Sequence, residues 1–196
     1  MRTLLQGEFM STLPILEIPH PTLRQRAKKV RRIDSKTLRL SYDMVDTLRE
    51  AGGVGLAANQ VGQLQRIIVV QLPEEESARI YINPEIIKKH GTRQVEEGCL
   101  SLPGYRGLIE RSVWIKFASV DHSSKKIGFR AEDLLAQILE HEVDHLNGIL
   151  YTDHLASHQD LYKIDDIPKI DSKTRDHSAT ETYDNDLDST ATIKVK

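Results

Sequence analysis

Residues 139–145 place a glutamate, Glu142, between two histidines that are four residues apart, His141 and His145. On an α-helix, residues i and i+4 share a face, so both histidines can offer a ring nitrogen to one metal ion. Glu142 would then lie next to any water molecule that the ion carries. The spacing therefore predicts a metal site of the kind that activates water.

The helix that would carry this motif has an apolar stripe, because Leu134, Ile138 and Leu139 fall on one arc at about 100° of rotation per residue. The histidines lie at the edge of that arc, and Glu142 lies within it. A carboxylate among leucines requires a reason, such as catalysis. The opposite arc is polar and is expected to face solvent: Asp133, Gln137, Glu140, Asp144 and Asn147.

A third ligand would strengthen the prediction, because catalytic metal sites usually combine three protein ligands with one open position. The single cysteine, Cys99, follows two acidic residues and Gly98, and we expect it in a glycine-flanked turn. A lone cysteine is most often an inert buried residue. Residue type alone leaves both interpretations open.

Three motifs, at residues 53–60, 97–101 and 141–148, together resemble those of the bacterial-type peptide deformylases. The resemblance covers roughly residues 14 to 155. It implies a metal-dependent hydrolase that removes the formyl group from the N-terminal formyl-methionine of new polypeptides. Metal-bound water would attack the formyl carbon, and formate would be released.

The resemblance implies Cys99, His141 and His145 as ligands of one divalent ion, with Glu142 as the general base on the bound water. In the family the physiological ion is usually Fe2+, and Zn2+, Ni2+ or Co2+ can occupy the site. A mixed thiolate and imidazole ligand set suits all of these ions, so the sequence does not decide between them.

The developing oxyanion needs hydrogen-bond donors besides the metal, and the resemblance assigns them to the side-chain amide of Gln60 and the backbone N–H of Leu100. Gly55 lets the chain approach a peptide substrate without a Cβ atom in the way. These three residues are expected to line the substrate site.

Four further residues are predicted to form the substrate site. Leu134 and Ile138 are candidates for the wall of a methionine pocket, and they are equally ordinary core residues. Arg106 matches a family position that contacts the peptide. Glu97 is expected in the same region, where it resembles the partner of Arg111 in an ion pair that braces the ligand loop.

Departures from the family pattern occur near the metal helix. Asp133 stands where glycine is usual, Glu140 where glutamine is common, and Gln137 where an apolar residue or arginine is typical. None of the three is an expected ligand. The departure at Gln137 leaves the substrate specificity less defined than the chemistry.

The elements that must position these residues follow from periodicity and turn signals. We expect helices at residues 21–29 and 35–51, a metal helix from about residue 131, and strands at residues 66–72, 79–82, 85–89 and 112–120. Asp34 or Ser35 would cap the second helix. The result is an α+β fold with mostly antiparallel sheets packed around a central metal-binding helix, which is also the family's arrangement.

Composition restricts the class of protein. The 196 residues and 39% hydrophobic content suit one ordinary core, and a net charge of −2 gives no basic footprint for sequence-specific nucleic acid binding. One cysteine excludes an intramolecular disulfide and suits a reducing, cytoplasmic compartment. No membrane span or signal peptide is expected, since no apolar run approaches about 20 residues.

We expect an N-terminal extension at residues 1–13, a catalytic domain at residues 14–155 and a polar, acidic tail at residues 156–196 that is partly disordered. Met10 is an alternative start. The expected partners are N-formyl-methionyl nascent polypeptides and, by resemblance, the ribosome near its exit tunnel. Many bacterial relatives end in a helix implicated in ribosome contact, but residues 159–170 here carry mixed charges rather than a basic pattern.

Two other classes of protein stay open. A zinc peptidase with the same helix motif would take a third ligand downstream, and His154 and His158 are available. A non-catalytic metal- or peptide-binding relative would be expected to lack Glu142 or Gln60, and both are present.

Overall fold

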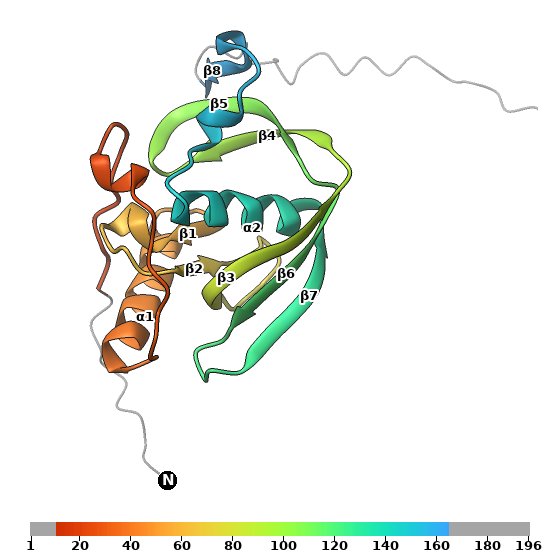
Figure 1. Ribbon diagram of the computed structural model, residues 1–196. Helices are drawn as coiled ribbons and strands as arrows, with labels where there is room; N and C mark the ends of the chain where they lie inside the picture. The colour runs from red at the N-terminus through yellow and green to blue at the C-terminus, as the bar shows by residue number, and fades with distance from the viewer. Residues whose placement is uncertain (1–10, 165–196) are drawn as a thin grey trace, which may run out of the picture.

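The computed structural model describes residues 11–164 as two antiparallel sheets with a helix between them (Figure 1). One sheet has five strands in the order β1-β2-β3-β6-β7, and the other has three in the order β4-β5-β8. The strands are β1 (Gly55–Ala57), β2 (Ile67–Val70), β3 (Arg79–His90), β4 (Arg93–Cys99), β5 (Leu102–Arg111), β6 (Trp114–Val120), β7 (Lys126–Glu132) and β8 (Leu161–Lys163). The helices are α1 (Ser35–Glu50) and α2 (Asp133–Leu146), with 3-10 turns at Pro21–Arg24, Ala58–Val61, Tyr151–His154 and His158–Asp160.

Helix α1 begins where the sequence predicts it, because the Asp34 side chain accepts a hydrogen bond from the Thr37 N–H. It ends at Glu50, one residue earlier than expected, and Gly52 follows with a φ of 63°. The predicted helix at residues 21–29 is wrong beyond its first turn. There the Ala27 N–H donates to the carbonyl of Leu146, so the backbone is paired with another segment instead of with itself.

Strand β2 is buried on both faces because α1 and α2 pack on opposite sides of it. Ile67 and Val69 belong to the core cluster with Leu48 of α1, whereas Ile68 and Val70 belong to the cluster with α2. A strand covered on both faces reads as a continuous apolar run, which is why it was recognisable in the sequence.

The two predicted strands at residues 79–82 and 85–89 form one strand, β3, with a bulge. The pairing of β3 with β6 shifts register between Ile82 and Glu85, and Asn83 there has a φ of 52°. The Asn83 side chain accepts from the Val30 N–H and donates to the Val30 carbonyl. The bulge therefore ties the N-terminal segment to the large sheet.

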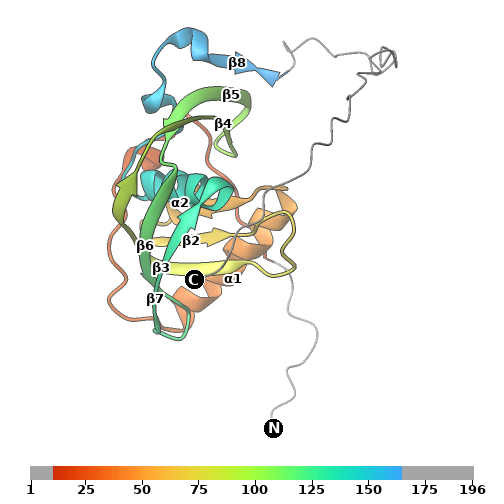
Figure 2. The same cartoon turned by 90° about the vertical axis from the view of Figure 1, so that its right-hand side faces the viewer.

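Helix α2 is buried on nearly all sides, so the prediction that its polar arc faces solvent is wrong for Glu140 and Asp144. Glu140 is 1% exposed and Asp144 is 8% exposed. Glu140 accepts from the N–H and hydroxyl of Ser112 and pairs with Lys89. The small sheet lies over α2, as Figures 1 and 2 show, and Arg111 of β5 pairs with Asp144, so both buried carboxylates have polar partners.

Asp133, at the start of α2, has a φ of 49°, in the left-handed region that favours glycine. The backbone here therefore has the conformation that the family's usual glycine would adopt without strain. Among the described residues, no helix is long and apolar enough to cross a bilayer.

The chain after residue 155 extends the small sheet, within the segment where the sequence predicts a tail. Strand β8 pairs antiparallel with β5, with Tyr105 opposite Lys163 and Gly107 opposite Leu161. The predicted disorder of the rest of the tail, the N-terminal extension before residue 11 and the alternative start at Met10 lie outside the described residues.

Candidate metal centre

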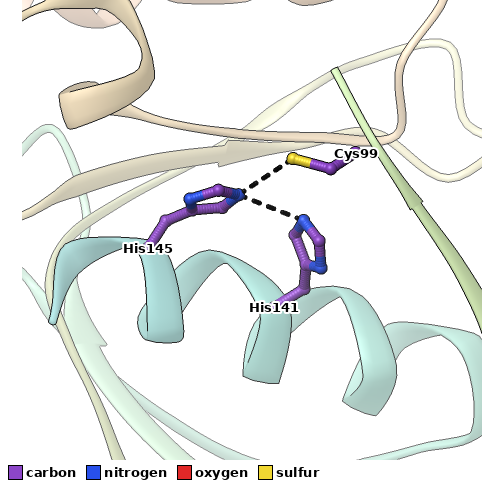
Figure 3. Close-up of side chains that lie close together, drawn as sticks. All are labelled: Cys99, His141 and His145. Carbon is purple, nitrogen blue, oxygen red and sulfur yellow. Dashed lines mark hydrogen bonds between the residues drawn. The ribbon is translucent and has the colours of Figure 1, made fainter. Parts of the chain in front are cut away.

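Cys99, at the end of β4, faces the two histidines of α2 (Figure 3). The Nε2 atom of His145 lies 3.1 Å from Cys99 Sγ and 3.2 Å from His141 Nε2, and the three ligand atoms lie within 4.8 Å of one another. A tetrahedral site with metal–nitrogen bonds of roughly 2.0–2.1 Å and a metal–sulfur bond near 2.3 Å has edges of about 3.3 to 3.6 Å. The donor set therefore fits one metal ion.

The position of Cys99 depends on an irregular hairpin between β4 and β5. Gly98 pairs with Arg106, and the register then shifts so that Cys99 pairs with Leu102. The Ser101 N–H points back at Cys99 Sγ, at 3.4 Å. The glycine-flanked turn expected from the sequence thus directs the sulfur toward α2 and holds it there.

Glu97 and Arg111 hold His141 from the side away from the cluster. Glu97 Oε2 lies 2.7 Å from His141 Nδ1, and the guanidinium of Arg111 donates to both Glu97 oxygens at 2.7 and 3.0 Å. Because a carboxylate accepts hydrogen bonds, Nδ1 carries the hydrogen and Nε2 keeps its lone pair for a metal. The ion pair expected between Glu97 and Arg111 is present and buried.

These contacts lower the pKa of two groups, Glu97 and Cys99. Burial raises the pKa of Glu97, but the hydrogen bonds from His141 and Arg111 outweigh burial and bring the pKa to about 2. Burial also raises the pKa of Cys99, yet the charges of and hydrogen bonds to His145 and His141 lower it well below its usual value. The pKa shifts therefore favour Cys99 as the thiolate that a metal ion binds and Glu97 as the carboxylate that orients His141.

Glu142 lies next to the cluster in a different environment. Burial raises the pKa of Glu142 to about 7, and its Oε2 atom is buried without a hydrogen-bond partner among the described residues. A Cβ atom at Gly55 would collide with Glu142 Oε1 and would lie 2.8 Å from Ile138 Cγ2. Glycine at position 55 is thus required for the close approach of β1 to this carboxylate.

Gln60 presents its side-chain amide to the same cluster. Its Oε1 atom accepts from the Ala57 N–H at 2.8 Å, which fixes the orientation of the amide. Its Nε2 atom lies 3.2 Å from Ser101 Oγ and 3.6 Å from Cys99 Sγ. The amide donor is therefore directed at the cluster and the hairpin turn.

A cavity of about 390 Å³ opens beside the cluster and brings the predicted substrate residues together. Leu134, expected either in the core or in a pocket wall, is 43% exposed and belongs to this wall. The predicted residues that line the cavity are Gly55, Gln60, Glu97, Cys99, Leu100, Arg106, Leu134, Ile138, His141 and Glu142. His145 lies behind them, in contact with Cys99 and His141.

Sequence reasoning missed several residues of the cavity wall. Gly104 and Tyr105 belong to β5, which was not predicted because its glycines and charged residues break the apolar alternation of a strand. Ile164 follows β8, within the segment predicted as a tail. Ile164 carried no signal in the sequence, because its role depends on the pairing of β8 with β5.

The downstream histidines are not at the cluster. His154 Nε2 lies 2.8 Å from Asp144 Oδ2, and His158 is exposed in a 3-10 turn. In the part of the chain that the structure describes, the candidate metal group contains Cys99 as its third member. This argues against the zinc peptidase alternative.

Comparison with known proteins decides the family. The model of the polypeptide deformylase family matches residues 12–160. The chain belongs to the polypeptide deformylase family. A peptide deformylase of Dehalococcoides mccartyi (strain BAV1) is 45% identical over 163 residues, which are 82% of this chain and 98% of the relative. One of Halothermothrix orenii is 46% identical over 147 residues, covering 75% of this chain and 96% of the relative.

Solved deformylase structures share the fold. The Legionella pneumophila enzyme superposes with a TM-score of 0.72 at 38% identity, covering 74% of this chain and 87% of that one. The Synechococcus elongatus enzyme in complex with actinonin superposes with a TM-score of 0.73 at 32% identity, covering 82% of this chain and 90% of that one. The α+β fold and the resemblance to deformylases are confirmed. The chain is a metal-dependent deformylase that removes N-formyl groups from nascent polypeptides.

Proposed function

We propose that Cys99, His141 and His145 of this deformylase bind one divalent ion and that Glu142 is its general base. The observation that carries the proposal is the convergence of three ligand atoms within 4.8 Å beside a buried carboxylate. When bound, the ion would supply the Lewis acidity that activates water and polarises the formyl oxygen. Metal analysis combined with formate release from formyl-Met-Ala-Ser tests the proposal.

Glu142 moves the proton. It accepts a proton from the attacking water as the oxygen–carbon bond forms, and it passes that proton to the nitrogen as the carbon–nitrogen bond breaks. A pKa of about 7 suits both transfers, since the carboxyl group must accept and donate near neutral pH. The products are formate and a peptide with a free amine.

Gln60 and Leu100 stabilise the negative charge that develops on the formyl oxygen. The Gln60 amide is held by the Ala57 N–H, so its Nε2 donor needs no rearrangement during the reaction. Leu100 lies in the hairpin turn directly after Cys99 and lines the cavity, where its N–H is the second donor.

The substrate enters the cavity with its methionine side chain against Leu134 and Ile138. Gly55 allows the substrate backbone to approach β1, and Arg106 contacts the peptide further out. Glu97 does not bind the substrate directly, because Arg111 donates hydrogen bonds to both of its oxygens and His141 donates to one of them. Its role is to orient His141.

Ferrous iron is the proposed physiological ion, from the family resemblance and the thiolate ligand. Ferrous iron and the Cys99 thiolate can both be oxidised, and Cys99 lines an open cavity. The iron-loaded enzyme should therefore lose activity in air, whereas the zinc- or nickel-loaded enzyme should keep it. Formate release measured over hours in air and under anaerobic conditions checks this. Equal aerobic half-lives for the iron and nickel forms would contradict it.

The ribosome is a proposed partner, and the surface charge supports it. Residues 24–32, the basic segment, carry six lysines and arginines and no acid, and all six are exposed. Arg24 and Lys29 pair with Asp153 and Glu85, while the other four have no acid within ion-pair distance among the described residues. Such a segment suits ribosomal RNA, which is a polyanion. A cytoplasmic location fits this partner and the single thiolate ligand.

Reversing two charges of the basic segment should weaken ribosome binding. Co-sedimentation with ribosomes at low salt is expected to fall at least about fivefold for the double variant Arg31→Glu, Arg32→Glu, because fewer counterions are released. The double variant Lys125→Glu, Lys126→Glu is the matched control, since this exposed pair lies where the β6–β7 turn meets the start of β7. If both double variants bound ribosomes equally, the basic segment would not be part of the ribosome interface.

A further inference from the structure

Strand β8 lies beside the part of β5 that lines the cavity (Figures 1 and 2). Tyr162 of β8 stands opposite Arg106, and Lys163 stands opposite Tyr105. Arg106 and Tyr105 are both cavity residues. The family model ends at residue 160, so β8 lies just beyond the portion of the chain that it matches.

Ile164 follows β8 directly and belongs to the cavity wall. Its side chain is 44% exposed, and Leu134 and Val54 in the same wall are 43% and 36% exposed. Exposed apolar side chains that gather around one opening are a feature of ligand-binding grooves. These three residues therefore form an apolar rim at the cavity.

A chain of hydrogen bonds connects β8 to Arg106. The Tyr162 hydroxyl donates to Glu96 Oε2, and Glu96 Oε1 accepts from Arg106 Nη1 at 2.8 Å. The Glu96 backbone carbonyl also accepts from the Gln137 amide at 3.0 Å. Glu96 is thus fixed from two sides, and it holds the guanidinium of Arg106 at the cavity.

We propose that β8 forms the outer wall of the substrate site, with Ile164 contacting an apolar side chain downstream of the formyl-methionine and Tyr162 positioning Arg106 through Glu96. This inference rests on the proposed function, because it assigns part of the same cavity to the peptide. It makes Ile164 a determinant of specificity and Tyr162 a positioning residue that does not itself touch the substrate.

The test of Ile164 compares kcat/KM for formyl-Met-Leu-Ser and formyl-Met-Ala-Ser. Wild-type enzyme is expected to prefer the leucine peptide, and Ile164→Ala should reduce that preference at least about threefold, because a pocket contact with added methylenes is lost. Leu108→Ala is the matched control, since Leu108 is 40% exposed on β5 but lies outside this cavity. If Ile164→Ala kept the wild-type preference for the leucine peptide, the assignment of Ile164 as a specificity determinant would be overturned.

The test of Tyr162 separates positioning from general stability. Tyr162→Phe should raise KM at least about threefold with little change in kcat, because binding is weakened without touching the reacting atoms. In an Arg106→Ala background the same substitution should have no further effect on KM. An equal KM increase in both backgrounds would show that Tyr162 acts independently of Arg106.

Two C-terminally truncated chains, in which the metal ligands and Glu142 are unchanged, provide a second measurement of KM. A chain ending at Asp160 lacks β8, and a chain ending at Ile164 retains it. The first should show a raised KM and the second a wild-type KM, with melting temperature measured for both. Equal KM values for the two truncated chains would overturn the proposal. If instead the wild-type enzyme released no formate from any formyl peptide, the proposed function itself would fail.

Discussion

Replacing Glu142 by alanine is expected to lower kcat for formate release at least about 100-fold, the scale of general acid–base catalysis. The metal content should stay close to that of the wild type, because Cys99, His141 and His145 remain in place. The carboxylate lies beside the cluster in a buried environment, and its Oε2 atom has no hydrogen-bond partner among the described residues, so it is free to take a proton from water. Stopped assays of formate together with metal analysis of the same samples measure both quantities.

The neighbouring buried glutamate of α2, Glu140, offers a matched control. Glu142→Gln and Glu140→Gln remove the same charge from the same helix without changing side-chain volume. Glu140 is bonded to Ser112 and Lys89, away from the cavity, so Glu140→Gln should keep kcat within a few-fold of wild type. A Glu142→Gln enzyme that works at near wild-type rate would show that the carboxylate is structural.

Replacing Arg111 by methionine is expected to cost about 3 to 5 kcal/mol in the free energy of unfolding. The guanidinium donates to Glu97 at 2.7 Å and to Asp144 at 2.5 Å, and all three side chains are buried. Removing the cation leaves two buried carboxylates with one histidine partner each, His141 for Glu97 and His154 for Asp144. For a chain of this size, the melting temperature should fall by about 10 °C.

An exposed ion pair provides the control for Arg111. Lys29 pairs with Glu85 at 2.5 Å, but both side chains are largely in solvent. Lys29→Met should therefore change the free energy of unfolding by less than about 1 kcal/mol. Thermal unfolding of both variants, followed by circular dichroism, makes the comparison. A melting temperature for Arg111→Met within about 2 °C of wild type would contradict the account.

The two histidine ligands were predictable from spacing alone, because i and i+4 share a helix face. Cys99 was not, since its contact with His145 spans 46 positions of sequence and required the resemblance of a whole motif. Helical periodicity also gave the wrong environment for Glu140 and Asp144. It assumes one buried face, whereas α2 lies between two sheets and is covered on both sides.

Strands β4 and β5 escaped the sequence analysis for a related reason. Their buried positions include Val95 and Ile109, which fit an alternating pattern, but also the charged residues Glu97 and Arg111. Hydrophobic alternation fails where a strand buries an ion pair. Because β4 supplies the buried carboxylate that orients His141, it lacks the alternating apolar pattern by which strands are predicted.

Removal and return of the metal tests the central claim most directly. The chain is treated with a chelator, dialysed without oxygen and titrated with Fe2+ or Ni2+ while formate release from formyl-Met-Ala-Ser is recorded. We predict no release without metal, then a linear rise that stops at one equivalent, the single site formed by Cys99, His141 and His145. Cys99→Ala should bind less metal and show no such break. Full activity in the metal-free chain, or an unchanged titration in Cys99→Ala, would contradict the account.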